Sequence, residues 1–122
     1  MIAVALTLAL TLACSRPAPE ANNQEPTAPP MEKAEQDRGL DLCIHYVARV
    51  CACAEHEAAL KEQCELGRSQ PQALRLQLSL LHGSAGKLND KERRVTEAAV
   101  RKVVAACVKA DAALSPATCP RQ

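Results

Sequence analysis

The chain has 122 residues, enough for one domain, and its formal net charge is only +1. So small a charge gives no strong electrostatic attraction to nucleic acid or to an acidic surface. The sequence also contains no Phe or Trp and a single Tyr, so it lacks the stacking platforms on which proteins bind single-stranded nucleic acid. We therefore expect no nucleic acid partner.

The apolar core of this domain is expected to be small. Hydrophobic residues make up 48% of the chain, but many of them are alanines, which bury little area each. Small domains with so thin a core usually need covalent crosslinks. The seven cysteines supply them if the protein is exported to an oxidising compartment.

Residues 1–13 read MIAVALTLALTLA, an uncharged and mostly apolar run. The run is too short for the apolar core of a bilayer, which takes about 20 residues, but it has the length of the apolar part of a secretory signal. We therefore expect residues 1–13 to be a signal peptide.

The next residues, Thr11-Leu12-Ala13-Cys14, resemble the lipobox of bacterial lipoproteins. In that family the cysteine thiol receives a diacylglyceryl group and the signal peptide is cut before it, so the resemblance implies that Cys14 is lipidated. Thr11 stands where the family usually has Leu, and no Lys or Arg precedes the apolar run. Removing Cys14 leaves six cysteines, an even number. The alternative is a secreted protein that is cut after Ala13.

Ser15 follows the expected lipidation site. In lipoproteins an Asp at that position indicates retention in the inner membrane. By analogy we expect palmitate-type acyl chains on Cys14 to anchor the protein in the outer membrane, where it faces the periplasm or the cell surface. Several acyl chains on one cysteine are enough for stable anchoring.

Residues 14–38 combine the lipid attachment site with a segment rich in prolines, namely Pro17, Pro19, Pro26, Pro29 and Pro30. Proline fixes φ and lacks a backbone N–H, so neither a helix nor a sheet ladder runs through such a segment. We expect residues 14–38 to be a disordered tether and residues 39–122 to be the folded domain.

The folded domain opens with a cysteine-rich helix. Apolar residues recur there at a spacing of three and four, namely Leu40, Cys43, Ile44, Val47, Val50, Cys51 and Ala54. On a straight helix Cys43 and Cys51 lie about 12 Å apart, too far for a disulfide. Each therefore needs a partner on another element. Cys53 reaches Cys64 only if the helix breaks near residues 55–58.

A second helix is predicted after Ser69. Ser69 is the expected N-cap, Gln72 would complete a capping box with it, and Pro71 lies in the first turn. Leucines then alternate with polar residues, as in a strand. We favour a helix because leucine forms helices well and the sequence offers no second strand to pair with.

The last helix follows a loop at residues 83–86 and begins at Asn89, with Glu92 as the reciprocal partner of a capping box. Ser115-Pro116 ends this helix, and the tail brings Cys119 back toward the bundle. The predicted fold is therefore all-α: a small three- to four-helix bundle with about three disulfides.

For the disulfides we favour a pairing that joins the opening helix to the closing helix and tail as antiparallel neighbours, and closes one local turn: Cys43–Cys119, Cys51–Cys107 and Cys53–Cys64. A link between Cys51 and Cys64 would contradict this pairing. The region from Leu40 to Cys119 resembles small cysteine-rich helical domains of exported bacterial proteins. The resemblance rests on Cys43-x-x-Tyr46, on the Cys51/Cys53 pair and on the late Cys107 and Cys119. The function of those domains is unknown, so the resemblance implies no activity.

Cys51, Cys53 and His56 are the one local cluster of metal-ligand residue types. Their spacing differs from that of common zinc knuckles, and residues 51 and 53 point to opposite sides of a helix. In an exported protein we favour disulfides at these cysteines. A metal-binding or metal-delivery lipoprotein is the alternative function, and no cofactor is expected.

The sequence does not predict an enzyme. The Cys-x-x-Cys spacing of redox proteins is absent. His45, His56 and His82 have no recognisable catalytic motif around them. We therefore assign no catalytic residue.

Two helices offer candidate interaction surfaces. The first is the helix that contains Leu74, Leu78 and Leu81. Its leucines lie nearly all round the helix, so the core cannot cover all of them and some are left as apolar surface for a partner. The basic face of the last helix is the other: Lys91, Arg94, Arg101 and Lys102. The sequence predicts a cell-envelope lipoprotein with a structural or protein-interaction role. Its expected partners are the membrane, through the lipid on Cys14, and an envelope protein.

Overall fold

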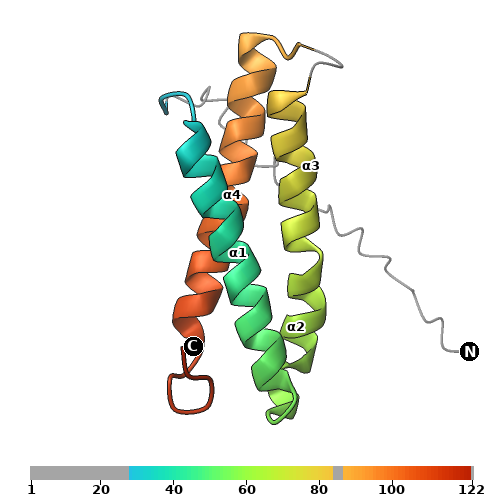
Figure 1. Ribbon diagram of the computed structural model, residues 1–122, viewed down its shortest axis with the longest axis vertical. Helices are drawn as coiled ribbons and strands as arrows, with labels where there is room; N and C mark the ends of the chain where they lie inside the picture. Colours follow the sequence, from blue (N-terminus) through green and yellow to red (C-terminus); the bar gives the residue numbers. More distant parts are fainter. Residues whose placement is uncertain (1–27, 84–86, 122) are drawn as a thin grey trace, which may run out of the picture.

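The computed structural model describes residues 28–83 and 87–121, which form an all-helical bundle (Figure 1). Its elements are α1 (Lys33–Ala54), a 3₁₀ turn η1 (Ala58–Leu60), α2 (Lys61–Arg68), α3 (Gln70–His82) and α4 (Asp90–Ala113). The described ranges contain no strand, and the predicted all-α class is confirmed. The predicted signal peptide, Cys14 and most of the predicted tether lie outside the described residues. None of the helices in these ranges is long and apolar enough to cross a membrane.

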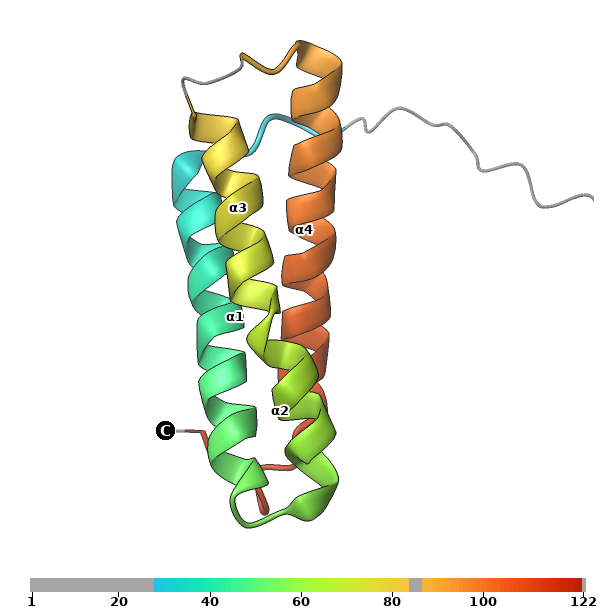
Figure 2. The ribbon, with the colours of Figure 1, turned by 90° about the vertical axis from the view of Figure 1, so that its right-hand side faces the viewer.

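α2 and α3 follow each other almost without interruption and form a single bent rod (Figure 2). Ser69, between them, has a helical backbone, and its hydroxyl donates to the carbonyl of Leu66. The predicted capping box of Ser69 and Gln72 is therefore wrong, because a capping residue needs a non-helical backbone. Pro71 lies at the junction, where its missing N–H and its ring bend the rod.

The three rods alternate in direction, so α1 and α4 run parallel, and the α2–α3 rod runs antiparallel to both (Figures 1 and 2). A residue of α1 and the residue that faces it on α4 or on the tail after α4 are therefore always separated by nearly the same number of positions in the sequence. The separation is 64 residues for Cys43 and Cys107 and 66 for Cys53 and Cys119.

All six cysteines of the bundle are paired, but in a different order from the predicted one. The disulfides are Cys43–Cys107, Cys51–Cys64 and Cys53–Cys119. The three predicted pairs, Cys43–Cys119, Cys51–Cys107 and Cys53–Cys64, are wrong. The first two assumed that the first and last helices are antiparallel, whereas an odd number of rods makes them parallel. The third assumed a local turn, whereas Cys64 pairs with Cys51.

The disulfides leave α1 in three directions, and α1 is therefore crosslinked to each other part of the bundle. Cys43 reaches α4, Cys51 reaches α2 and Cys53 reaches the tail after α4. The expected divergence of residues 51 and 53 is confirmed. α1 also ends at Ala54, which is the break that a Cys53–Cys64 pair would have required, although Cys53 pairs with Cys119 instead.

The folded part begins before residue 39, where the domain boundary was predicted. α1 starts at Lys33, and Met31 is already buried in the core. Gln36 donates to the carbonyl of Met31 at 3.0 Å, and Arg101 of α4 donates to the carbonyl of Pro29 at 2.8 Å. The predicted extent of the tether is therefore wrong, because Met31 gives the segment an apolar anchor and residues 31–38 contain no proline.

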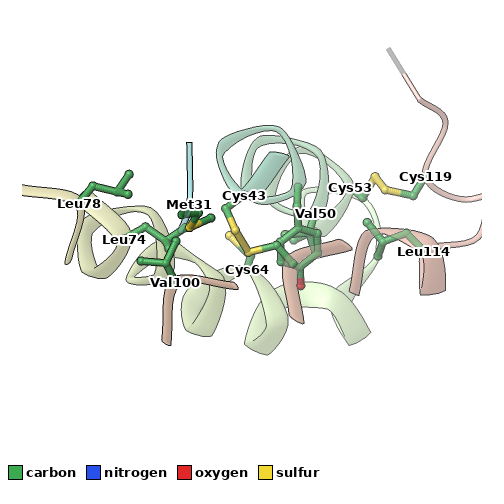
Figure 3. Close-up of a cluster of buried hydrophobic side chains, with 13 residues drawn as sticks. Met31, Cys43, Val50, Cys53, Cys64, Leu74, Leu78, Val100, Leu114 and Cys119 are labelled. Atoms are coloured by element: carbon green, nitrogen blue, oxygen red, sulfur yellow. A yellow bond between two sulfur atoms is a disulfide. The ribbon is translucent and has the colours of Figure 1, made fainter. Parts of the chain in front are cut away.

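The core lies where the three rods meet (Figure 3). Its largest fully buried side chains are Leu74, Val50 and Val100, and the remaining fully buried ones are cysteines. Sulfur thus occupies space that aromatic rings fill in larger domains. The capping box at the start of α4 is confirmed, with Glu92 N 2.9 Å from Asn89 Oδ1 and Asn89 N 2.8 Å from Glu92 Oε2.

Candidate functional site

A half-open groove of about 750 Å³ lies between α1 and α4, near the C-terminal ends of both helices. Its apolar walls come from Leu42, Ala48, Ala52, Val108 and Ala112. Polar side chains of the turn after α1 and of the tail gather toward one end, namely Glu55, His56, Thr118 and Arg121, and His45 lines the groove farther along α1. No residue of α2 or α3 lines the groove, because that rod covers the other side of the α1–α4 pair.

One wall of the groove is formed by a second face of α1, which differs from the face that packs into the core. Leu42, His45, Arg49 and Ala52 recur at a spacing of three and four, as residues on one helical face do. The cysteine and valine stripe turns toward the core, and this second stripe turns toward the groove.

Arg49 forms the floor of the groove, and its side chain is only 9% exposed. Its Nη1 donates to Asp111 Oδ1 at 2.8 Å and to the Asp111 carbonyl at 3.2 Å. Its Nε donates to the carbonyl of Cys119 at 3.1 Å. A buried cation is tolerated when it is paired and hydrogen-bonded in this way. Arg49 therefore joins α1 to the end of α4 and to the tail.

Asp111 has further neighbours in the groove. Arg121 Nη2 lies 3.8 Å from its second carboxylate oxygen. Burial raises the pKa of the Tyr46 hydroxyl above its ordinary value of 10.0, and the Asp111 carboxylate raises it further. Tyr46 is therefore a neutral phenol at physiological pH. Sequence reasoning missed Arg49 and Asp111, although the single charged residue in the otherwise apolar stretch from Tyr46 to Ala54 was a usable signal.

The structure separates Cys51, Cys53 and His56, the cluster considered as the alternative metal site. Cys51 is bonded to Cys64 and Cys53 to Cys119, so neither offers a thiolate ligand in this oxidised structure. Within residues 28–83 and 87–121 no group of three or more metal-binding side chains is found.

The three histidines lie at different places in the bundle. His45 and His56 line the same groove, although α1 ends before His56. His82, at the end of α3, lies within hydrogen-bond distance of Gln36 Oε1. An amide oxygen only accepts, so His82 Nε2 is the donor. This bond ties the end of α3 to the start of α1.

The predicted leucine surface is wrong for Leu74, Leu78 and Leu81. Leu74 and Leu78 are buried, and Leu81 is half-buried against the core. The exposed leucines of the same helix are Leu76 and Leu80, which are 65% and 51% exposed. The reason is the helical period: positions four and seven residues after 74 share its face, whereas position 76 lies nearly opposite.

The predicted basic face of α4 is not uniform. Lys91 and Lys102 are exposed, and Arg94 is half-buried. Arg101 donates to Glu35 Oε1 at 3.0 Å as well as to the carbonyl of Pro29. Arg101 therefore fixes the segment before α1 against α4, and it is not available as a free surface charge.

Three comparisons with known proteins were made. No protein-family model, no curated protein and no solved structure matches this chain. The role of the groove therefore has to be argued from its own residues.

Proposed function

We propose that this protein is a lipid-anchored protein of the bacterial cell envelope whose helical bundle has a structural or protein-binding role. The distribution of the cysteines carries the proposal. Six of them form three disulfides in the bundle, which fits an oxidising compartment. The seventh, Cys14, lies in the stretch that resembles a lipobox.

The groove supports a binding role. Apolar walls with a few polar groups at one end are typical of sites that bind a partner or a ligand. The buried charges of its floor, Arg49 and Asp111, are already used to hold α1, α4 and the tail together. Their role is therefore to hold the elements that form the groove in place.

The placement of the groove also fits an anchored protein. Residues 28–32 cross α4 toward the end of the bundle where α1 begins, and the groove residues lie toward the opposite end (Figure 2). The segment that leads toward Cys14 therefore joins the bundle away from the groove.

The intact mass of the native protein, purified from bacterial membranes, tests the proposal. We expect loss of residues 1–13, the added mass of acyl chains on Cys14, and the mass deficit of three disulfides. Radioactive palmitate should label the natural chain and leave Cys14→Ser unlabelled. A mature chain without acyl groups would contradict the lipid anchor. Bound metal with free thiols at Cys51 and Cys53 would instead favour the metal-binding alternative.

A further inference from the structure

We propose that two copies of this chain pair through the outer face of the α2–α3 rod, with the two rods antiparallel. This surface, the rod face, consists of the exposed side chains of Leu66, Ser69, Ala73, Leu76 and Leu80. The inference rests on the proposed protein-binding role and names a second copy of the chain as the partner.

The rod face is strongly exposed and apolar. Leu66 and Leu76 are 66% and 65% exposed, more than any other large hydrophobic side chain in residues 28–83 and 87–121. The rod lies on the near side of the bundle in Figure 2, so its outer face points away from α1 and α4. A continuous apolar surface in such a place is typical of an interaction site.

The residues of the rod face have the spacing of a helix that packs against another helix. Leu66, Ala73 and Leu80 are seven positions apart, and Ser69 and Leu76 follow the first two after three positions. These are the a and d positions of a heptad repeat. Ser69 has a helical backbone, so the repeat continues from α2 into α3. The exposed leucines therefore form one strip along the rod.

The order of large and small side chains in the strip indicates a second copy as its partner. When two such rods pack antiparallel, an a residue of one faces a d residue of the other. One register places every leucine against a small residue, as interdigitating layers require. It pairs Leu66 with Gly83, Ser69 with Leu80 and Ala73 with Leu76. Parallel rods would instead place alanine against alanine and leave gaps, which are unfavourable.

The charges also favour a second copy. A surface that meets its own copy brings like charges together, so it has to be nearly uncharged along the contact. From Ser69 to Gly83 only Arg75 and His82 have side chains that can carry a charge, and both lie about 100° or more round the helix axis from the strip. The exposed side of α4 carries Lys102 and Lys109 seven positions apart, and it would meet its own copy with like charges.

The hydroxyl groups of this part of the rod can be covered at little cost. Ser69 Oγ donates to the carbonyl of Leu66 at 3.1 Å, and Ser79 Oγ donates to the carbonyl of Leu76 at 2.7 Å. Because both hydroxyls are already bonded within their own helix, removing water from them leaves no donor without a partner.

The area of the contact predicts a weak dimer. In this register the two rods overlap from Leu66 to Gly83, over about 27 Å. The facing half of a helix about 10–12 Å across then amounts to roughly 450 Å² per copy, or roughly 900 Å² in total. Interfaces below about 1,200 Å² are typical of weak and transient complexes. We therefore expect a reversible dimer with a dissociation constant on the order of 10–100 μM.

Sedimentation equilibrium tests the inference. The protein is the oxidised chain from residue 14 onward with Cys14→Ser, which contains the whole bundle but neither a lipid nor an unpaired thiol. We expect a monomer–dimer equilibrium. Ala73→Glu should raise its dissociation constant about tenfold or more, because it buries an unpaired carboxylate in the contact. Ala105→Glu, on an exposed part of α4, is the matched control and should leave the constant unchanged.

Ser69→Glu and Leu80→Lys test the antiparallel register. Each alone should weaken the dimer about tenfold, because a charge is then covered without a partner. Together they should pair several-fold more tightly than either alone, because the new carboxylate of one copy faces the new ammonium group of the other. The two positions lie about 16 Å apart on one rod, too far to pair within one chain. Parallel rods would bring like charges together and give no recovery.

Three results would overturn the inference: a chain that stays monomeric up to about 1 mM, equal weakening by Ala73→Glu and Ala105→Glu, or no recovery in the double variant. Loss of the dimer in Ala112→Glu but not in Ala73→Glu would also contradict it, because Ala112 lines the groove between α1 and α4. Circular dichroism of each variant confirms that the fold is unchanged. The proposed lipid anchor is read from the intact mass, so these outcomes leave it standing.

Discussion

Arg49 donates to the Asp111 carboxylate at 2.8 Å, and this ion pair joins the middle of α1 to the last turn of α4. The pair is more than a surface contact, because the Arg49 side chain is largely buried and also binds the carbonyl of Cys119. Several predictions on stability and connectivity depend on it and on the parallel course of the two helices.

Arg49→Ala should destabilise the fold by about 2–4 kcal/mol, because it removes the buried partner of the Asp111 carboxylate and of the Cys119 carbonyl. Urea unfolding of the oxidised protein measures the loss. Arg68→Ala is the control, since the ion pair of Arg68 with Glu65 is exposed and should contribute under about 1 kcal/mol. Equal losses in the two variants would show that the Arg49 network adds no stability.

Tyr46 should make the fold less stable at alkaline pH. Its pKa is raised in the folded state, by burial first and by Asp111 second, so the folded state holds the phenolic proton more tightly than the unfolded chain. This contribution is fully present below pH 10.0 and is lost as the pH rises through the raised pKa.

Tyr46→Phe should remove that alkaline component, because phenylalanine does not titrate. The free energy of unfolding of both proteins, measured between about pH 8 and pH 11.5, gives the comparison. Subtracting one curve from the other removes the contribution of the lysines, because both proteins contain the same lysines. Parallel curves over the whole range would contradict a raised pKa at Tyr46.

Gly39 and Gly67 should respond in opposite directions to replacement by alanine. A Cβ at Gly39 would lie 2.7 Å from Val104 Cγ2, which is too close, whereas a Cβ at Gly67 would lie 3.5 Å from the Tyr46 ring in ordinary contact. Gly67→Ala should therefore stabilise the protein by about 0.5–1 kcal/mol through helix propensity.

Gly39→Ala should lose this gain or become destabilising, because the clash forces α1 and α4 apart. Thermal unfolding measures both variants. Val104→Ala combined with Gly39→Ala should recover part of the stability by making room for the new methyl group. A stabilised Gly39→Ala variant would show that the two helices are less closely packed than the structure has them.

Tryptic digestion without reduction should give two disulfide-linked species. Peptide 39–49 should be joined to peptide 103–109, and peptide 50–61 should be joined to both 62–68 and 110–121. Mass spectrometry distinguishes this result from the antiparallel pairing, in which 50–61 is joined to 103–109. The latter species would contradict the parallel arrangement of α1 and α4. Reduction before digestion is the control and should release all five peptides.

Much of the local structure could be predicted from the sequence. The capping box of Asn89 and Glu92 depends only on neighbours a few residues apart. The helix at residues 70–82 follows from leucine propensity and the absence of a pairing strand. The six cysteines of the bundle could also be assigned to disulfides, although not to their partners.

The candidate groove could not be predicted in the same way. His45 and His56 were noticed in the sequence, but Arg49 and Asp111 are 62 residues apart and meet only through tertiary packing. The exposed leucines were located on the correct helix but on the wrong face, because the side of α3 that packs against α1 and α4 depends on how the rods are placed.

Periodicity, caps and cysteine content act over short distances, so they were enough to predict a helical and crosslinked bundle. The direction of α4 relative to α1 could be read only from the packed rods. That direction depends on whether the chain continues as one rod through Ser69 and Pro71 or turns there. Because it continues, the rods are three in number, α1 and α4 are parallel, and Cys43 meets Cys107.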